Sequence, residues 1–228
     1  MTGTLVAVVA VAAVAIVALT VALWRALRGG RRLPGAVIGE AHSLTSLDDA
    51  TGAVRSVQSA EVSLPTEALE QIWAPENLER LARTYWRFLS RVTLGLIHVA
   101  YSEHDRSIVL LAPPLKLLTF HAPEYEMSEE RGLVRWRIAR GLLVSKPGHD
   151  GDGYLQIEVR RGAPAPDGQA QLHVAVEVAN FYPSIASRLS RRFYDATQSR
   201  IHVIVTNRFL RSLQRLDLAE SRVGRYRA

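Results

Sequence analysis

Cysteine is absent from this 228-residue chain, and lysine is scarce. The lack of cysteine excludes disulfides, thiolate nucleophiles and zinc or iron–sulfur sites with cysteine ligands. Lys116 and Lys146 are the only lysines, so arginine supplies nearly all of the positive charge behind a formal net charge of +6. Such a balance suits an anionic lipid surface, a nucleic acid or simple solubility, and it does not choose among them.

Catalytic and cofactor-binding motifs are missing as well. The chain has no HExxH metal pair, GxSxG nucleophile elbow, Walker loop or dinucleotide-binding GxGxxG. The segment 149–152 could offer ligands to a cation, but the remaining positions of a calcium-binding loop are absent, which favours a solvated turn. The sequence therefore predicts no catalytic residue, no metal ligand and no cofactor, and it favours a protein that is not an enzyme.

An uninterrupted apolar run occupies residues 5–24. Thr20 is its only polar side chain, and its length matches the roughly 20 helical residues that cross a hydrocarbon core about 30 Å thick. Trp24 lies where interfacial aromatic residues are found. No basic residue precedes the run, which disfavours a cleaved signal peptide. Residues 1–28 are therefore predicted to form a transmembrane anchor.

Basic residues follow the apolar run directly. The predicted membrane-surface residues are Arg25, Arg28, Arg31 and Arg32. By the positive-inside rule these arginines stay in the cytoplasm, close to anionic headgroups. The predicted topology is a single-pass membrane protein with its N-terminus outside and its soluble domain cytoplasmic. Residues 29–54 are expected to form a basic, flexible linker between the anchor and that domain.

Residues 55–216 carry the periodicity of one folded domain. A first strand is expected to end at Pro65, followed by two short helices, and the period changes to two after Thr84. The expected strands are Phe88–Tyr101, Ser107–Ala112, Leu115–Met127, Leu133–Val144, Tyr154–Arg161 and Leu172–Phe181. Short, turn-like separators join these strands, which predicts antiparallel hairpins. A long helix from about Ile185 to Leu216 and a polar tail over residues 217–228 complete the chain.

This order of elements resembles the helix-grip fold of the START and polyketide-cyclase (SRPBCC) superfamily. The likeness is carried by the opening segment Glu61–Trp73, the strands that end in Leu172–Tyr182, and the closing helix. It implies an α+β fold in which a curved antiparallel sheet wraps around the long C-terminal helix, here with one transmembrane helix added. Members of the superfamily bind lipids, sterols, polyketides or other apolar molecules between the sheet and the helix. Some are enzymes, and others are carriers or adaptors.

The leading hypothesis is a membrane-anchored cytoplasmic domain that binds a hydrophobic small molecule or lipid in such a cavity. The predicted lining residues are Trp136, Ile138, Ile157, Val174, Val176, Phe193, Ile201 and Ile204. An ordinary filled core is the competing interpretation at each position.

Two other functions remain open from the sequence. One is a protein-interaction module of a membrane complex, which would add a protein partner to the bilayer and the apolar ligand. The other is an enzyme of the cyclase or aromatase type, although the central strands lack the polar cluster that would mark such a site. Nucleic acid is disfavoured as a partner, because no recognition motif interleaves aromatic residues with the arginines.

Overall fold

The computed structural model describes residues 36–102, 105–111, 115–163 and 168–183, together with 205–206, 209–211, 213 and 219. The predicted membrane span, its four arginines and most of the predicted C-terminal helix lie outside these residues. Within the described part, no helix combines the length and the apolar character that a membrane span requires.

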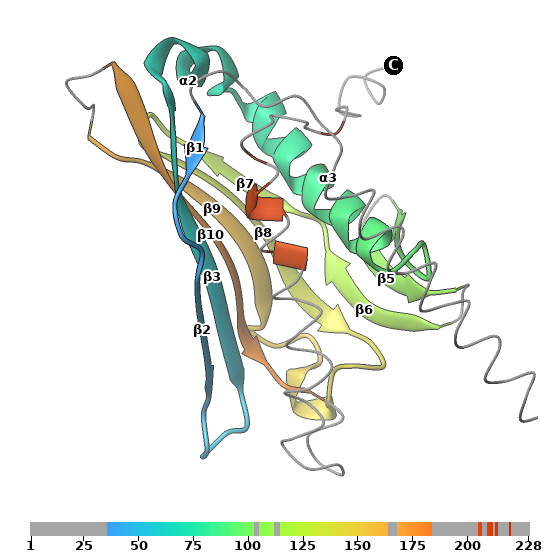
Figure 1. The fold of residues 1–228 in the computed structure, drawn as a ribbon. Helices are drawn as coiled ribbons and strands as arrows, with labels where there is room; N and C mark the ends of the chain where they lie inside the picture. The colour runs from blue at the N-terminus through green and yellow to red at the C-terminus, as the bar shows by residue number, and fades with distance from the viewer. Residues whose placement is uncertain are drawn as a thin grey trace, which may run out of the picture.

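A single large antiparallel sheet dominates the fold (Figure 1). Its strands are β1 (Val37–Ile38), β2 (His42–Leu47), β3 (Val54–Pro65), β4 (Ile97–Tyr101), β5 (Asp105–Leu110), β6 (Lys116–His121), β7 (Glu124–Met127), β8 (Arg131–Arg140), β9 (Tyr154–Arg161) and β10 (Gln169–Phe181). Their order is β1-β3-β10-β9-β8-β6-β5-β4, with β2 paired to β3 and β7 paired to β8. The helices are α2 (Thr66–Ile72), α3 (Pro75–Val92) and the 3₁₀ turn η1 (Lys146–Gly148). The predicted α+β class with an antiparallel sheet is thus confirmed.

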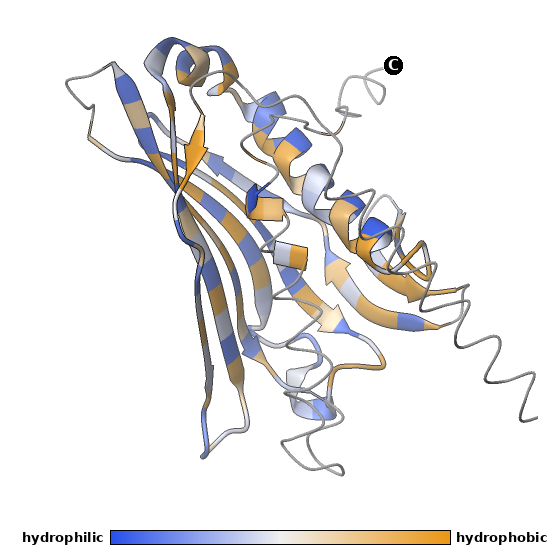
Figure 2. Cartoon of the chain, viewed as in Figure 1, coloured by the Kyte–Doolittle hydropathy of each residue, from blue (hydrophilic) through white to orange (hydrophobic). Residues whose placement is uncertain are grey.

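The hydrophobic core lies between the inner face of this sheet and α3, around which the sheet curves (Figure 1). Residues alternate between buried and more exposed along β3 and β10, as the period-two pattern predicts, and Figure 2 shows the same alternation in hydropathy. Trp86 of α3 packs on Trp136 of β8 with ring centroids 5.0 Å apart, and on Phe120 of β6 at 5.8 Å. Aromatic packing therefore joins the helix to the centre of the sheet.

Helix α3 is longer than the sequence interpretation allowed. We expected a short helix and then a strand from Phe88, but the helix continues to Val92 and β4 begins only at Ile97. Phe88 and Leu89 extend the buried face that Leu78 starts, at the three- and four-residue spacing of a helix. The helix ends where Leu94 and Gly95 adopt positive φ values of 55° and 80°.

Two further strand boundaries differ from expectation. The strand expected over Leu115–Met127 is divided into β6 and β7 around Pro123, which has no backbone N–H to donate to a neighbouring strand. In addition, β1 and β2 lie within the segment 29–54 that was expected to be a flexible linker, and both pair with β3. That segment lacks a strong apolar alternation, and its strands form because β3 offers a free edge.

Candidate ligand cavity

A cavity of about 180 Å³ lies between α3 and the inner face of the sheet, and we call it the main cavity. Its described lining residues are Thr45, Val54, Ser56, Tyr85, Trp86, Leu89, Ile97, Ile108, Leu117, Leu118, Phe120, Ile138, Leu143, Leu155, Val178, Phe181 and Val205. Most of these side chains are apolar, and they come from β2, β3, α3, β4, β5, β6, β8, β9 and β10. An engineered apolar cavity of about 150 Å³ binds benzene, so the main cavity has room for a group of at least one ring.

A second cavity of about 80 Å³ lies towards the other end of the same inner face. Helix α2, the first turns of α3 and the inner residues of β3, β9 and β10 form its walls, including Leu69, Leu78, Val62 and Leu172. Its volume suits a few carbon atoms at most. The main cavity is therefore the stronger candidate for a ligand site.

The sequence-predicted lining residues divide into three groups. Ile138 lines the main cavity, and Val174 lines the second one. Trp136, Ile157 and Val176 are buried in the core, with exposed fractions of 2%, 0% and 0%, but they line neither cavity. Phe193, Ile201 and Ile204 lie outside the described residues. The alternation of each strand identifies its inner face, whereas only the packing of all the elements decides which inner residues border empty space.

Two polar side chains, Thr45 and Ser56, interrupt the apolar wall of the main cavity. The buried Gln58 is bonded to Ser56 but does not itself line the cavity, and we call the three residues the polar corner. Thr45 and Ser56 are directly opposite each other on β2 and β3, and their hydroxyl oxygens are 2.8 Å apart. Gln58 is 0% exposed, and its Nε2 donates a 2.8 Å hydrogen bond to Ser56 Oγ. Gln58 Oε1 is buried without a hydrogen-bond partner. The sequence interpretation missed this corner.

A signal for the polar corner was nevertheless present in the sequence. Strand β3 begins at Val54, so strict alternation from Val54 to Leu64 places Ser56 and Gln58 on the inner face. Counting Val57 as an inner residue instead would conceal two polar residues in an otherwise apolar row. Val57 is in fact the less buried residue, on the outer face.

Tyr85 is a further polar group on the wall of the main cavity. Burial raises the pKa of the Tyr85 hydroxyl well above its ordinary value, and the neighbouring Thr206 side chain offsets only part of that rise. The phenol therefore stays protonated at physiological pH. It can take part in hydrogen bonds, but it cannot serve as a general base.

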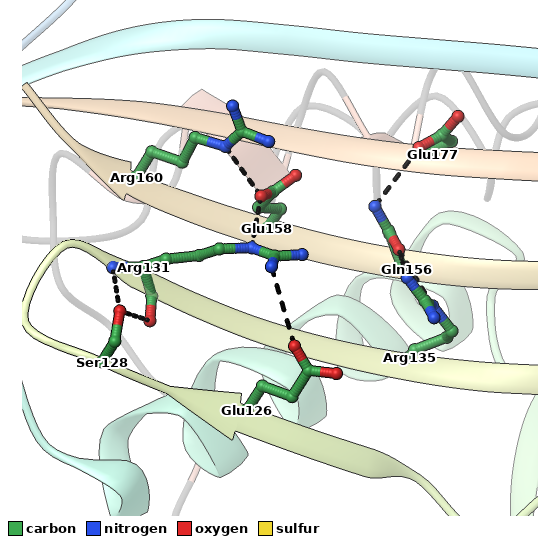
Figure 3. A network of polar contacts seen from close by, with 8 residues as sticks. All are labelled: Glu126, Ser128, Arg131, Arg135, Gln156, Glu158, Arg160 and Glu177. Carbon is green, nitrogen blue, oxygen red and sulfur yellow. Dashed lines mark hydrogen bonds and ion pairs between the residues drawn. The ribbon is translucent and has the colours of Figure 1, made fainter.

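The outer face of the sheet carries a network of charged and amide side chains (Figure 3). Arg131 and Arg160 each donate a 2.7 Å hydrogen bond to the same oxygen of Glu158. Burial by itself raises the pKa of Glu158, but the hydrogen bonds and charges of the two arginines outweigh that effect and hold the pKa below its usual value. These groups are paired with one another, so the network supports the sheet and offers no reactive side chain.

No catalytic or metal-binding arrangement stands out in the described part of the molecule. No group of three His, Asp or Glu side chains there could hold a metal ion. The pKa shifts of Arg137 and Glu158 accompany ion pairs, and the pKa of Tyr154 is raised mainly by burial. The main cavity with its polar corner is accordingly the feature of this structure best suited to binding a small molecule.

Comparison with known proteins adds little to this geometry. No protein-family model matches the chain, and no curated protein matches it. Among solved structures, human StAR-related lipid transfer protein 5 is 13% identical with a TM-score of 0.32, over 90% of this chain and 96% of that one. An uncharacterized protein from Bacillus thuringiensis is 11% identical with a TM-score of 0.31, over 69% of this chain and 97% of that one. A conserved protein from Geobacillus kaustophilus is 10% identical with a TM-score of 0.30, over 69% and 94%. TM-scores and identities this low support no argument, so the assignment of the main cavity as the candidate site depends on its geometry alone.

Proposed function

We propose that this chain is a binding domain for a hydrophobic small molecule or lipid, held in the main cavity. The observation that supports the proposal is a cavity of about 180 Å³ with a mostly apolar lining, whose described residues come largely from α3 and eight strands. Apolar surface that leaves water gains roughly 25 cal/mol per Å², so such a wall favours an apolar guest over water. The ligand would be held by contact with side chains such as Trp86, Phe120 and Ile138, without a covalent step.

Two parts of this proposal rest on the sequence. The segment 185–216 would form the long helix that closes the grip of the sheet, since its apolar residues recur at helical spacing. The apolar run at 5–24, with arginines after it, would hold the domain at the cytoplasmic side of a membrane. A ligand that partitions into lipid would then be concentrated beside the domain.

The test is to identify what the protein carries after purification. The full chain is produced as wild type and as Leu118→Trp, which places a large ring in the main cavity, and apolar compounds are extracted and identified by mass spectrometry. Leu44→Trp is the matched control, because Leu44 is on the outer face of β2 and is 62% exposed. We expect a stoichiometric apolar compound in wild type and in the control, and its loss from Leu118→Trp.

Two results would contradict the proposal. One is the absence of any apolar compound from wild-type protein, combined with failure to take up added apolar probes. The other is equal recovery from wild type and Leu118→Trp, which would place the compound outside the main cavity. Crosslinking of the same preparation to a specific protein would then favour the interaction-module alternative.

A further inference from the structure

We infer that one end of the sheet docks on the surface of a bilayer that contains anionic lipids, through five exposed leucines. These residues, which we call the leucine edge, are Leu94, Leu96, Leu111, Leu115 and Leu142. They are between 39% and 62% exposed. The inference goes beyond the proposed function, because contact between this edge and lipid does not require a ligand in the main cavity.

Backbone hydrogen bonds bring the leucine edge together from three parts of the chain. The amide of Leu111, directly after β5, donates a 2.7 Å hydrogen bond to the carbonyl of Leu96, directly before β4. Leu115 accepts a 2.9 Å hydrogen bond from the last residue of β5. The amide of Leu142, which follows β8, donates to the carbonyl of Lys116 at 3.1 Å. The leucines therefore form one exposed apolar patch, and such a patch marks contact with a membrane or another protein.

Neither the backbone nor the core explains leucine at two of these positions. Leu94 and Leu111 have φ values of 55° and 62°, in the left-handed region where glycine is favoured and leucine is uncommon. Both side chains are exposed, so they bury little apolar surface within the chain in return. Contact with an apolar partner outside the chain gives these side chains a role that the fold does not.

The charges beside the leucine edge are positive. In the three segments that carry the leucines, 91–97, 110–117 and 141–146, the charged residues are Arg91, Lys116 and Lys146, and all three are exposed. By contrast, Asp105 and Asp150 lie at the other end of the neighbouring strands. Asp105 begins β5, and Asp150 Oδ1 is 3.4 Å from Nε2 of His121, the last residue of β6. The surface around the leucines is thus suited to an anionic partner.

An anionic bilayer fits this combination better than a second copy of the chain. A symmetric pair of chains would bring the same basic residues of both copies to one interface, without acidic residues to balance them. Anionic headgroups attract basic residues, and leucines beside those residues enter the boundary between the headgroups and the acyl chains. A bilayer is also the partner that the apolar run at 5–24 predicts from the sequence.

The experiment measures whether the leucine edge contacts lipid. Since the chain has no cysteine, Leu111→Cys provides a single site for the polarity-sensitive fluorophore NBD. Leu44→Cys is the matched control, because Leu44 and Leu111 are both 62% exposed and Leu44 is on β2, which pairs with β3 far from β5 in the order of the sheet. Each labelled full-length protein is assembled into nanodiscs of phosphatidylcholine with or without phosphatidylserine, and quenching by nitroxide-labelled lipids is recorded.

In nanodiscs with phosphatidylserine, we expect the emission of the fluorophore at position 111 to shift to the blue and to be quenched by the nitroxide lipids. The fluorophore at position 44 should remain in water. Lys116→Gln should lower the ratio of docked to undocked domain about fivefold, the effect of one basic residue near an anionic surface. Arg55→Gln, which removes an exposed charge from β3, should leave that ratio unchanged. If Leu111→Cys fails to fold, Leu142→Cys places the fluorophore on the same edge.

Three results would overturn the inference. The first is equally weak quenching at positions 111 and 44. The second is a blue shift at position 111 without quenching by the lipids, since a second copy or another protein would then cover the edge. The third is equal quenching at position 111 with and without phosphatidylserine, which would exclude recognition of anionic lipid. The extraction of apolar compounds from wild type tests the main cavity separately, so the proposed function can stand or fail independently of this edge.

Discussion

Replacement of Gln58 by leucine should stabilise the ligand-free protein, although Gln58 takes part in a hydrogen bond. The variant loses the bond to Ser56 Oγ, which contributes about 1 kcal/mol. It also removes the buried, unpartnered Oε1, whose burial costs about 1–3 kcal/mol, and it adds apolar surface to the core at 0% exposure. The balance favours the variant by about 1–2 kcal/mol, on the order of 2–8 °C in Tm for a chain of this size.

The measurement is urea unfolding of the full chain in a mild non-ionic detergent, followed by the fluorescence of its buried tryptophans. Gln156→Leu is the matched control, because Gln156 is also buried, yet its Oε1 accepts 3.1 and 2.9 Å hydrogen bonds from Arg135 and its Nε2 donates to Glu177. That substitution should destabilise the protein by about 2 kcal/mol. A Gln58→Leu variant that is less stable than wild type by about 1 kcal/mol or more, roughly the contribution of one hydrogen bond, would refute this reasoning. It would indicate that Gln58 Oε1 accepts a hydrogen bond from a donor such as a buried water.

Three further predictions concern the core, the outer face and the anchor. Trp86→Ala should lower the free energy of unfolding by about 3–5 kcal/mol, because Trp86 packs on both Phe120 and Trp136. A loss below about 1 kcal/mol in the same urea titration would contradict that packing. The pKa of Glu158 is lowered in the folded state, so its pairing contributes stability above the unfolded pKa of about 4.5, and this contribution is lost as the pH falls through the lower folded pKa. Urea titrations between neutral and acidic pH should show this loss of stability in wild type and a smaller loss in Glu158→Gln. Equal pH profiles of stability for the two proteins would contradict a stabilising role for the Glu158 pairing. A reporter fused after Ala228 should be active in the cytoplasm, and activity only outside it would overturn the predicted topology.

Much of the sheet could be predicted from local patterns. The strand expected over Tyr154–Arg161 has the bounds of β9, whose Leu155, Ile157 and Val159 pack in the core while Gln156 and Glu158 pair with arginines on the other face. Each of these strands has one face towards an apolar core, so side-chain chemistry repeats every two residues whatever lies on either side. The degree of burial was less predictable, because Glu158 is on the outer face and yet is 8% exposed beneath the side chains of Arg131 and Arg160.

The sequence by itself determined the class of this fold, through the spacing of apolar residues and the turn-forming segments between them. Such signals are local, because neighbours at two or four positions decide whether a segment suits a strand or a helix. Only the tertiary structure decided that α3 extends to Val92 and that inner side chains leave a cavity beside Thr45 and Ser56. A cavity is the space that packed elements fail to fill, so it depends on the positions of many residues at once and cannot be obtained from the period of any one strand.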